Sequence, residues 1–580
     1  MMQKTLWLTS TILSATAHAA TLQDVCTTFH VQASLPAEGD IDGVTVDSSS
    51  VYATPVYNAS VSGADFYPDA TFDYCNVSFA YSHNGRDDQV LLQYWLPSPD
   101  KFQNRYLATG GGGFAISSQT QSLPGGIIYG AAAGTTDGGF GGFSNNFDSV
   151  FLLANGTINY EALYMFGYRG IGEATQIGLE LTKNFYNASA KVYTYYQGCS
   201  EGGREGWSQV QKFGDLYDGV IPGAPAFRYG QQQVNHLTSN VIEKTLEYYP
   251  APCEFDKIVN ETIKFCDPLD GLADGVVSRT DLCLLQFNIN STIGLPYYCA
   301  ATQGGGNPFG PGGGVALPAQ NGTVTAQAAA VAQAIINGLH DTSGKLAYIS
   351  YQPSASFADA QTAYNNATGS WELSISSFGG EWVAKFLQLR NASTLETLDG
   401  VTYDTLRDWM QLGWQLYEDV LQTTWPDLTA FQSHGGKVLT YHGESDNSIP
   451  AGSSVHYHES VRNIMYPDLA FNDSSEALGD WYRLFLVPGA AHCGPNSEQP
   501  NGPFPQTNLA VLIDWVEKGV VPQTLNATVL QGKKKGENRQ ICAWPLRPLW
   551  SGNGTLDCVY DQESIDTWMY DFDAYKLPLY

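Results

Sequence analysis

A serine in this chain lies in a setting that is typical of a nucleophile. Residues 198–202 read Gly-Cys-Ser-Glu-Gly and fit Gly-x-Ser-x-Gly, in which small residues allow a tight strand-to-helix turn that projects the serine hydroxyl. Because the chain has 60 glycines, the pattern alone is weak, and its context matters more. A strand-like run, Val192 to Tyr196, precedes it, and a helical run, Arg204 to Phe213, follows it. The sequence therefore predicts that Ser200 is a nucleophile.

A serine nucleophile needs a histidine base and a carboxylate that orients the base, and the sequence offers both. His492 and Asp446 each lie in a loop that follows a predicted strand. The order Ser200, Asp446, His492 matches the order nucleophile, acid, base of α/β-hydrolases. His442 precedes the acid, so we interpret it as a loop-packing residue. Glu444 is the alternative acid.

The oxyanion that forms during attack on an ester needs hydrogen-bond donors. One is expected to be the amide of the residue after the nucleophile, which is Glu201. Residues 109–114, Thr-Gly-Gly-Gly-Gly-Phe, follow a strand-like run and offer unobstructed amides, so Gly111 and Gly112 are the predicted second donors. A phosphate-binding loop is the alternative, but the run lacks the lysine and the spacing of such loops.

Cysteines adjoin both the predicted nucleophile and the predicted base. Cys199 precedes the serine and Cys493 follows the histidine, so contact between serine and histidine would bring the two sulfurs within range of a disulfide. Cys266 and Cys283 bracket an acidic run and are expected to form a second disulfide. The other cysteines are Cys26, Cys75, Cys253, Cys299, Cys542 and Cys558. Full pairing of all ten is expected because their number is even, although the pairing of Cys253 and Cys299 stays open.

The acidic run could bind a metal ion. Asp267, Asp270 and Asp274 lie at spacings of three and four among glycines, which gathers oxygen ligands for a hard cation such as Ca²⁺. The carbonyls of Leu272 and Val276 would alternate with the carboxylates. The run is not an EF-hand, because its spacing differs and no glutamate closes it. A plain acidic turn is the alternative.

The predicted elements place these residues in an α/β fold. Strand-like runs alternate with glycine-rich turns and helical patterns over residues 75–225, and the same alternation returns near the C-terminus. The predicted strands are 89–95, 105–109, 191–197, 437–441 and 481–487, and the predicted helices include 204–213, 325–337 and 508–518. The part of the chain between these two regions has a different sequence pattern and contains a Gly/Pro-rich loop at 303–314. We predict a catalytic core formed by residues 20–224 and 431–580, with an inserted lid domain at 225–430.

Composition and the N-terminus indicate a secreted protein. The formal net charge of −29 argues against nucleic acid and anionic membranes as partners. Residues 1–19 are predicted to be a signal peptide, because their apolar run is much shorter than the ~20 residues of a membrane anchor. Asn-x-Ser/Thr sequons, which indicate glycosylation, occur at Asn58, Asn76, Asn155, Asn187, Asn260, Asn290, Asn321, Asn366, Asn391, Asn472, Asn526 and Asn553.

Four motifs together resemble the tannase and feruloyl esterase family. They are YYQGCSEGGREG (195–206), CDPLDGLADG (266–275), HGESD (442–446) and GAAHCG (489–494), in the family's order and over nearly the whole mature chain. The resemblance implies an α/β-hydrolase core with an inserted lid, a Ser–Asp–His triad, and a disulfide between the triad-adjacent cysteines. It also implies small phenolic esters as substrates and a structural Ca²⁺ in the lid, held by the three aspartates and two carbonyls named above.

The resemblance also carries the prediction of substrate. Segments 222–228, 231–236 and 276–283 are more similar to the tannases of the family than to its feruloyl esterases, which favours hydrolysis of galloyl esters through an acylated Ser200. Hydrolysis of feruloyl esters is the alternative. A calcium-dependent carbohydrate-binding or adhesion protein with an inactive core is a further hypothesis, and the intact triad order counts against it. Nothing in the sequence indicates the oligomeric state.

Overall fold

The structure is a computed structural model that describes residues 20–302, 316–552 and 554–580. The predicted signal peptide, the Gly/Pro-rich loop and the sequon at Asn553 lie outside these residues. Within the described ranges, no helix has the length and apolar character needed to cross a membrane.

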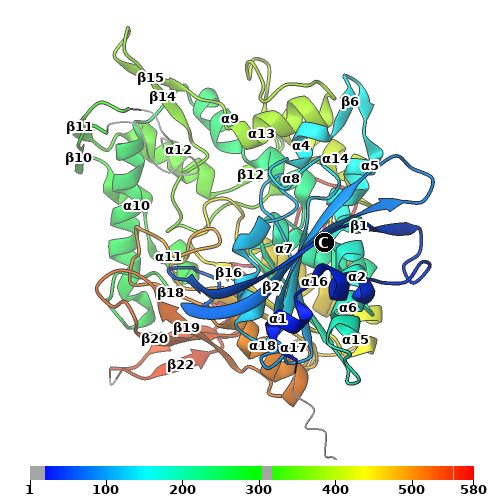
Figure 1. The fold of residues 1–580 in the computed structure, drawn as a ribbon. Coiled ribbons are helices and arrows are strands. Elements are labelled where there is room, and N and C mark those ends of the chain that lie inside the picture. Colours follow the sequence, from blue (N-terminus) through cyan, green and yellow to red (C-terminus); the bar gives the residue numbers. More distant parts are fainter. Residues whose placement is uncertain (1–19, 303–315, 553) are drawn as a thin grey trace, which may run out of the picture.

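One sheet of nine strands forms the centre of the molecule (Figure 1). In spatial order its strands are β1 (Val44–Val61), β2 (Ala70–His83), β3 (Val90–Pro97), β5 (Ala131–Thr136), β4 (Arg105–Thr109), β8 (Tyr193–Cys199), β9 (Gly219–Gly223), β16 (Lys437–Gly443) and β17 (Tyr482–Val487). In this spatial order, each pair of neighbouring strands from β1 through β5 is antiparallel, and each pair from β5 through β17 is parallel. Because parallel strands end at the same edge of a sheet, the loops after β4, β8, β16 and β17 meet there.

Helices bury both faces of the parallel strands. Neighbouring residues of a strand point to opposite faces, and in β16 Val438 joins one apolar core whereas Leu439 joins the other. The first core includes residues of α6 (Gly170–Phe185), α7 (Glu201–Lys212) and α16 (Gly452–Met465), and the second includes residues of α18 (Asn508–Lys518) and Leu123, which precedes the single turn α3 (Pro124–Ile127). A parallel sheet that is covered on both faces holds its strand ends in fixed positions.

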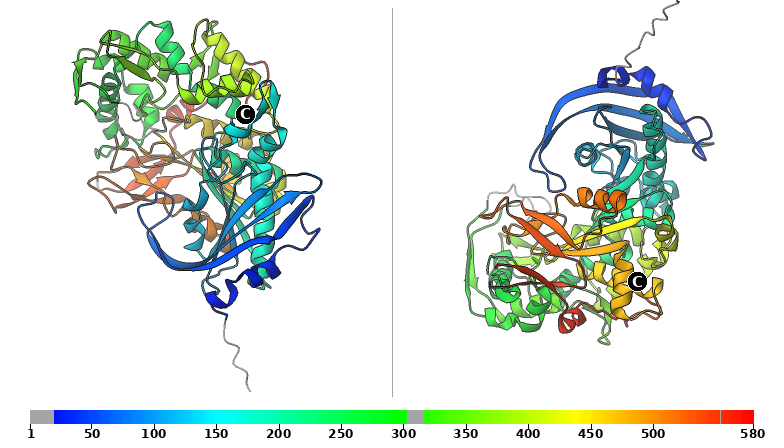
Figure 2. Two further views of the ribbon diagram at one scale, coloured as in Figure 1. Left: turned by 45° about the horizontal axis from the view of Figure 1, so that its top comes forward. Right: turned by 90° about the horizontal axis from the view of Figure 1, so that it is seen from below.

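The described residues between β9 and β16 contribute no strand to this sheet. They form α8 (Tyr229–Asn235), α9 (Thr238–Thr245), α10 (Pro252–Cys266), α11 (Thr280–Gln286), α12 (Ala326–Ile336), α13 (Ser377–Glu381), α14 (Tyr403–Tyr417), α15 (Thr429–His434) and the hairpins β10 (Pro296–Cys299)–β11 (Gln320–Thr323), β12 (Leu339–His340)–β13 (Leu346–Tyr348) and β14 (Thr362–Asn365)–β15 (Ser370–Leu373). Figure 2 shows most of these green segments gathered at one end of the molecule, away from the blue β1–β2 hairpin. The predicted lid, 225–430, falls inside this interval, and its exact boundaries stay predictions.

Smaller elements complete the chain. They are α1 (Leu22–Val25), α2 (Thr28–Ser34), α4 (Phe147–Val150), β6 (Leu152–Ala154), β7 (Thr157–Ile158), α5 (Tyr160–Tyr164), α17 (Phe471–Gly479), β18 (Pro503–Phe504), β19 (Thr524–Val529), β20 (Asn538–Cys542), β21 (Arg547–Trp550), β22 (Leu556–Val559) and α19 (Gln562–Asp566). Strands β18, β19 and β20 form a separate three-stranded sheet that follows the histidine loop in the chain.

Candidate active site

Ser200 lies at a strained turn between a strand and a helix. β8 ends at Cys199, α7 begins at Glu201, and Ser200 between them has φ 67° and ψ −121°. Residues other than glycine seldom adopt a positive φ, and such strain persists only where the surroundings fix it. Here the Ser200 N–H donates to the Gly223 carbonyl at 3.0 Å, and a Cβ on Gly203 would lie 2.3 Å from that same oxygen. The predicted strand–serine–helix turn is confirmed.

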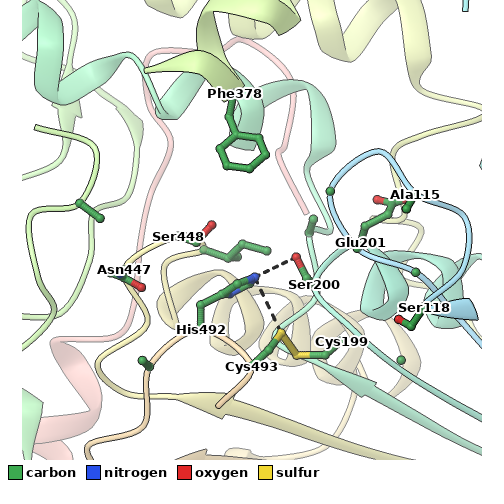
Figure 3. Close-up of a pocket in the computed structure, with 18 of the residues that line it drawn as sticks. Ala115, Ser118, Cys199, Ser200, Glu201, Phe378, Asn447, Ser448, His492 and Cys493 are labelled. Carbon is green, nitrogen blue, oxygen red and sulfur yellow. Dashed lines mark hydrogen bonds between the residues drawn. A yellow bond between two sulfur atoms is a disulfide. The ribbon is translucent and has the colours of Figure 1, made fainter. Parts of the chain in front are cut away.

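The three predicted catalytic side chains form one hydrogen-bonded chain. His492 Nε2 lies 2.8 Å from Ser200 Oγ (Figure 3), and His492 Nδ1 lies 2.8 Å from Asp446 Oδ2. When the Nδ1 proton is donated to the carboxylate, Nε2 is left to accept the serine proton. The pKa of the buried Asp446 is held well below its usual range, because the charge of His492 and the hydrogen bonds from His442 and His492 outweigh the effect of burial. The acid is therefore ionised whenever His492 acts as a base.

A second histidine contacts Asp446, the predicted acid. His442 is fully buried, and its Nε2 lies 3.1 Å from Asp446 Oδ2 and 3.0 Å from the Ile449 carbonyl. Both neighbours are acceptors, so this nitrogen carries a proton, while Nδ1 lies 2.8 Å from Ser454 Oγ. Asp446 Oδ1 accepts from the amides of Ser448 and Ile449 at 2.8 and 2.9 Å. The interpretation of His442 as a loop-packing residue was incomplete, because its imidazole also helps to hold the acid.

Glu444, the alternative acid, has other partners. Its Oε2 accepts from Arg547 Nη2 at 2.7 Å and from Thr280 Oγ1 at 2.6 Å. Arg547 also contacts Asp281 Oδ1 at 3.2 Å, and all these groups are buried. This network ties the loop of the catalytic acid to α11 of the intervening segment, and it leaves Asp446 as the acid that contacts His492.

The predicted oxyanion donors are supported only in part. Glu201 is the first residue of α7, and the first amides of a helix have no intrahelical carbonyl as a partner. The Glu201 amide therefore stays the predicted donor. The Gly111 N–H donates to Glu205 Oε2 at 2.9 Å, and the Gly112 N–H donates to the Ala115 carbonyl at 3.1 Å. In this conformation both amides are occupied, which corrects the expectation that they are free. The lack of a side chain at Gly111 allows close packing, since a Cβ there would lie 1.8 Å from the Ala115 oxygen, whereas a Cβ on Gly112 would have no neighbour within 4 Å.

All ten cysteines are paired, as predicted. The pairs are Cys26–Cys75, Cys199–Cys493, Cys253–Cys299, Cys266–Cys283 and Cys542–Cys558. The second pair joins residues 294 positions apart, with a Cα–Cα distance of 6.0 Å. It lies beside Ser200 and His492 in Figure 3. The bridge therefore limits how far the nucleophile and base loops can separate.

The acidic run predicted to bind Ca²⁺ is a compact loop whose side chains bond to its own backbone. Asp267 Oδ1 accepts from the amides of Asp274 and Val276, and Asp270 Oδ1 accepts from that of Leu272. Burial raises the pKa of Asp270 to about 6, and the charges of Asp274 and Asp267 add to this effect. Among the described residues, no three His, Cys, Asp or Glu side chains form a group that could hold a metal ion by themselves. Any cation here would therefore need carbonyl oxygens as well.

This loop is in contact with the histidine loop. Asn501 Nδ2 donates to the Asp274 carbonyl at 2.7 Å, and the Val277 N–H donates to Gln499 Oε1 at 2.7 Å. A Cβ on Gly489 would lie 2.8 Å from Val276 Cγ1, so the two loops pack closely. Gly489 precedes the base by three residues. If the acidic loop became disordered, the histidine loop would lose these contacts, and the position of His492 would change.

The triad opens into a cavity of about 1020 Å³. The sheet side supplies the glycine loop, the serine turn, and the loops of the acid and the histidine, and the intervening segment supplies α8, α10 and residues near 356–361 and 377–378. Phe378 lies across the open space from Ser200 and His492 (Figure 3). The cavity is large enough for an aromatic ester. Of the lining residues from the intervening segment, Ala226, Gln232, Gln233 and His236 lie in the segments that the sequence had marked as similar to tannases, and the others had not been indicated.

The comparison with known proteins agrees with this geometry. The family model described as tannase and feruloyl esterase matches residues 75–565. The chain belongs to the tannase and feruloyl esterase family. As a member of this family it is a carboxylic ester hydrolase with an α/β-hydrolase core, which confirms the expected fold and enzyme class.

Relatives in the family differ in how similar they are to this chain. The tannase of Aspergillus oryzae is 54% identical over 98% of both chains, and a probable feruloyl esterase of Arthroderma benhamiae is 31% identical over 85% of this chain and 87% of its own. A tannin acyl hydrolase structure from Aspergillus niger has a TM-score of 0.94 and 60% identity, covering 97% of this chain and all of that one. Feruloyl esterase B from Aspergillus oryzae has a TM-score of 0.67 and 26% identity, covering 90% and 97%.

Proposed function

We propose that this chain hydrolyses galloyl esters of tannins and releases gallic acid through an acyl-enzyme on Ser200. The observation that carries the proposal is the Ser200–His492–Asp446 chain at the wall of a cavity wide enough for an aromatic ester. The galloyl group is favoured because relatives named tannase or tannin acyl hydrolase are 54% and 60% identical, against 31% and 26% for those named feruloyl esterases.

The geometry supports a two-step reaction. Ser200 Oγ attacks the ester carbonyl while its proton passes to His492 Nε2, and the imidazolium that forms is stabilised by Asp446. The amide of Glu201, the first residue of α7, would donate to the oxyanion. His492 then protonates the leaving alcohol, so the galloyl group remains on the serine. A water molecule, deprotonated by His492, attacks this ester and releases gallate.

A partitioning experiment tests the shared acyl-enzyme. Propyl gallate and ethyl gallate, each incubated with enzyme and a fixed concentration of methanol, should give the same ratio of methyl gallate to gallic acid. The reason is that both esters pass through one galloyl-Ser200, which water and methanol then divide. A product ratio that depends on the starting ester contradicts the common intermediate. Failure to release any gallic acid contradicts the galloyl substrate.

We also propose that the acidic loop binds one structural Ca²⁺. The carboxylates of Asp267, Asp270 and Asp274 and the carbonyls of Leu272 and Val276 would be its ligands. The buried Asp270 supports this, because its pKa is raised by burial and further by the charges of Asp274 and Asp267, and a bound cation would favour its ionised form. Asp274, the third predicted ligand, contacts Arg539 and Lys534, so its charge is already partly compensated.

Removal of Ca²⁺ should lower thermal stability first and activity second. Chelator treatment, or the Asp267→Asn/Asp270→Asn pair, should lower Tm by about 3–6 °C, because a ligand that binds only the folded state stabilises it. The kcat should fall only partly, through the contacts of this loop with the histidine loop. Adding Ca²⁺ back to chelated wild-type enzyme should restore both, whereas Mg²⁺, which demands a stricter octahedral geometry, should not. Immediate loss of all turnover with Tm unchanged would instead indicate a catalytic metal.

Secretion and glycosylation are part of the same proposal. Five disulfides are typical of proteins that fold in an oxidising compartment. The sequon asparagines that are exposed are Asn58, Asn155, Asn187, Asn260, Asn290, Asn321, Asn366, Asn391 and Asn472. Asn76 and Asn526 are half-buried, and their side-chain oxygens accept from Gln93 and Gln540. Glycopeptide mapping of the secreted protein should therefore find glycans at exposed sites and none at these two.

A further inference from the structure

A fully buried glutamate connects the helix that follows Ser200 to the glycine-rich loop after β4. Glu205 lies on α7, five residues after Ser200, and none of its surface is exposed. Its Oε2 accepts the Gly111 N–H at 2.9 Å, and its buried Oε1 has no hydrogen-bond partner among the described residues. A buried carboxyl with an unpaired oxygen lowers the stability of a fold, so a role other than stability has to be considered for it.

The cation next to Glu205 in the chain is committed to other groups. Arg204 pairs with Glu201, and its remaining nitrogens donate to the carbonyls of Phe166 and Gly167. Burial raises the pKa of Glu205 well above its usual range, and the charge of Glu201 adds to this effect. The carboxyl is therefore un-ionised at neutral pH, and it holds the loop by a hydrogen bond and not by an ion pair.

The glycine loop, residues 110–113, is in direct backbone contact with the start of α7. Gly111 is bound through both of its backbone groups, since its N–H donates to Glu205 and its carbonyl accepts from the Gly202 N–H at 3.2 Å. A Cβ on Gly202 would lie 2.8 Å from the Gly111 oxygen, so the loop and the helix approach each other more closely than a side chain would allow. The bond to Glu205 helps to fix the distance between the glycine loop and the first turn of α7.

We propose that Glu205 is a positioning residue, which fixes the glycine loop at the distance from Ser200 at which the loop and the Glu201 amide bind the oxyanion together. Gly111 lines the cavity with Ser200 and Glu201. Its own amide is used as the anchor, so the second donor would come from the residues that follow it in the loop. The inference rests on the acyl transfer at Ser200 in the proposed function, and it holds whichever ester is cleaved. Donors stabilise a developing charge only while their position is kept, so loosening this anchor slows the chemical steps more than it weakens substrate binding.

Two substitutions separate the acceptor from the rest of the side chain. Glu205→Leu keeps most of the volume and removes the acceptor, so kcat on methyl gallate should fall by about 10²-fold while KM stays within about threefold. Acylation and deacylation both form an oxyanion, so kcat falls whichever step limits it. Glu205→Gln keeps an oxygen for the Gly111 N–H and removes no charge, so its kcat should stay within about fivefold of wild type.

Glu243→Leu is the matched control. Glu243 is also fully buried, its Oε1 also has no partner in the described part of the chain, and burial raises its pKa to about 8. It lies on α9 and is not one of the described residues that line the cavity. Its replacement should change Tm, as Glu205→Leu does, but should leave kcat within about threefold of wild type, because only a structural contact is lost.

A second readout separates positioning from packing. Phenylboronic acid binds Ser200 Oγ as a tetrahedral boronate and places one boron hydroxyl where the oxyanion forms. Its inhibition constant should rise by about tenfold or more in Glu205→Leu, because that variant binds the mimic of the intermediate less well. The constant should stay near the wild-type value in Glu205→Gln and in Glu243→Leu.

Three results would overturn the inference. They are a kcat within about threefold of wild type in Glu205→Leu, an unchanged inhibition constant for the boronic acid, and a loss in Glu205→Gln as large as in Glu205→Leu. If Glu205→Leu does not fold, Glu205→Asp, whose acceptor is set back by one carbon, replaces it in the comparison. If wild-type enzyme releases no gallic acid from methyl gallate, the proposed function is wrong, and the same variants are measured on methyl ferulate, where Glu205→Leu should show the same loss of kcat.

Discussion

Replacing Ser200 with alanine should lower the rate of galloyl ester hydrolysis by about 10⁴- to 10⁶-fold, the range expected when a triad loses its nucleophile. The hydroxyl is the only group removed, and its hydrogen-bond partner is His492. The backbone contacts of residue 200 with Gly223 and Ala226 do not involve the side chain, so they are kept. The folded state should therefore be nearly as stable as that of wild type. Gallic acid release and thermal unfolding, measured on the same preparation, check both parts.

Ser208→Ala is the matched control for this variant. Ser208 lies on the same helix, α7, and its hydroxyl donates to the Glu205 carbonyl away from the triad. It should keep wild-type turnover within about threefold, because a helix-internal hydrogen bond contributes only about 1 kcal/mol to stability and nothing to the reaction. If Ser200→Ala retained more than a few per cent of wild-type turnover, Ser200 would not be the nucleophile.

Asp446→Asn should lower kcat by about 10⁴-fold, because the amide would impose the wrong proton position on His492. Asp446 Oδ1 accepts from two backbone amides, so the oxygen of asparagine is favoured on that side. Its NH₂ group would then face His492 Nδ1 and His442 Nε2. A donor facing Nδ1 forces the histidine proton onto Nε2, and that nitrogen can no longer accept the proton of Ser200.

Glu444→Gln makes the same chemical change two residues earlier in the loop. It removes the charge that Arg547 needs in a buried site and should cost several kcal/mol of stability, about 3–5. The kcat at a temperature where the variant is folded should stay within about threefold of wild type, since no contact with His492 is lost. If kcat were instead lost in Glu444→Gln and kept in Asp446→Asn, Glu444 and not Asp446 would be the acid that orients His492.

The elements with a strong apolar pattern could be predicted from the sequence, and those without it could not. Strand β4 and helix α18 were predicted at the residues where they occur, because β4 is mostly apolar and the apolar residues of α18 recur on one face. Strand β5 reads Ala-Ala-Ala-Gly-Thr-Thr and β9 reads Gly-Val-Ile-Pro-Gly, compositions that favour turns or no element. They are strands because neighbouring strands pair with them, which local propensity does not encode.

The contact of Ser200, His492 and Asp446 was predictable because the chemistry and the chain order of these residues are local or sequential signals. The second partner of the acid, His442, was not, since a buried histidine in a loop looks the same whether it packs or donates. The occupied amides of Gly111 and Gly112 depend on Glu205, which lies 94 residues from Gly111. His236 and Asp359 are 123 residues apart and meet only through the fold of the intervening segment. Contacts of this kind need the structure.

A competition between two substrates tests the central claim most directly. Enzyme is given equal concentrations of methyl gallate and methyl ferulate in one vessel, and the initial ratio of gallic to ferulic acid gives the ratio of the two kcat/KM values. Ser200→Ala is the blank. The carboxylates that line the cavity and the shorter galloyl group should give a ratio of at least about 10², because a site built to bind three ring hydroxyls rejects an acid that carries only one. Equal amounts of the two acids, or an excess of ferulic acid, would contradict the galloyl assignment and identify the chain as a feruloyl esterase.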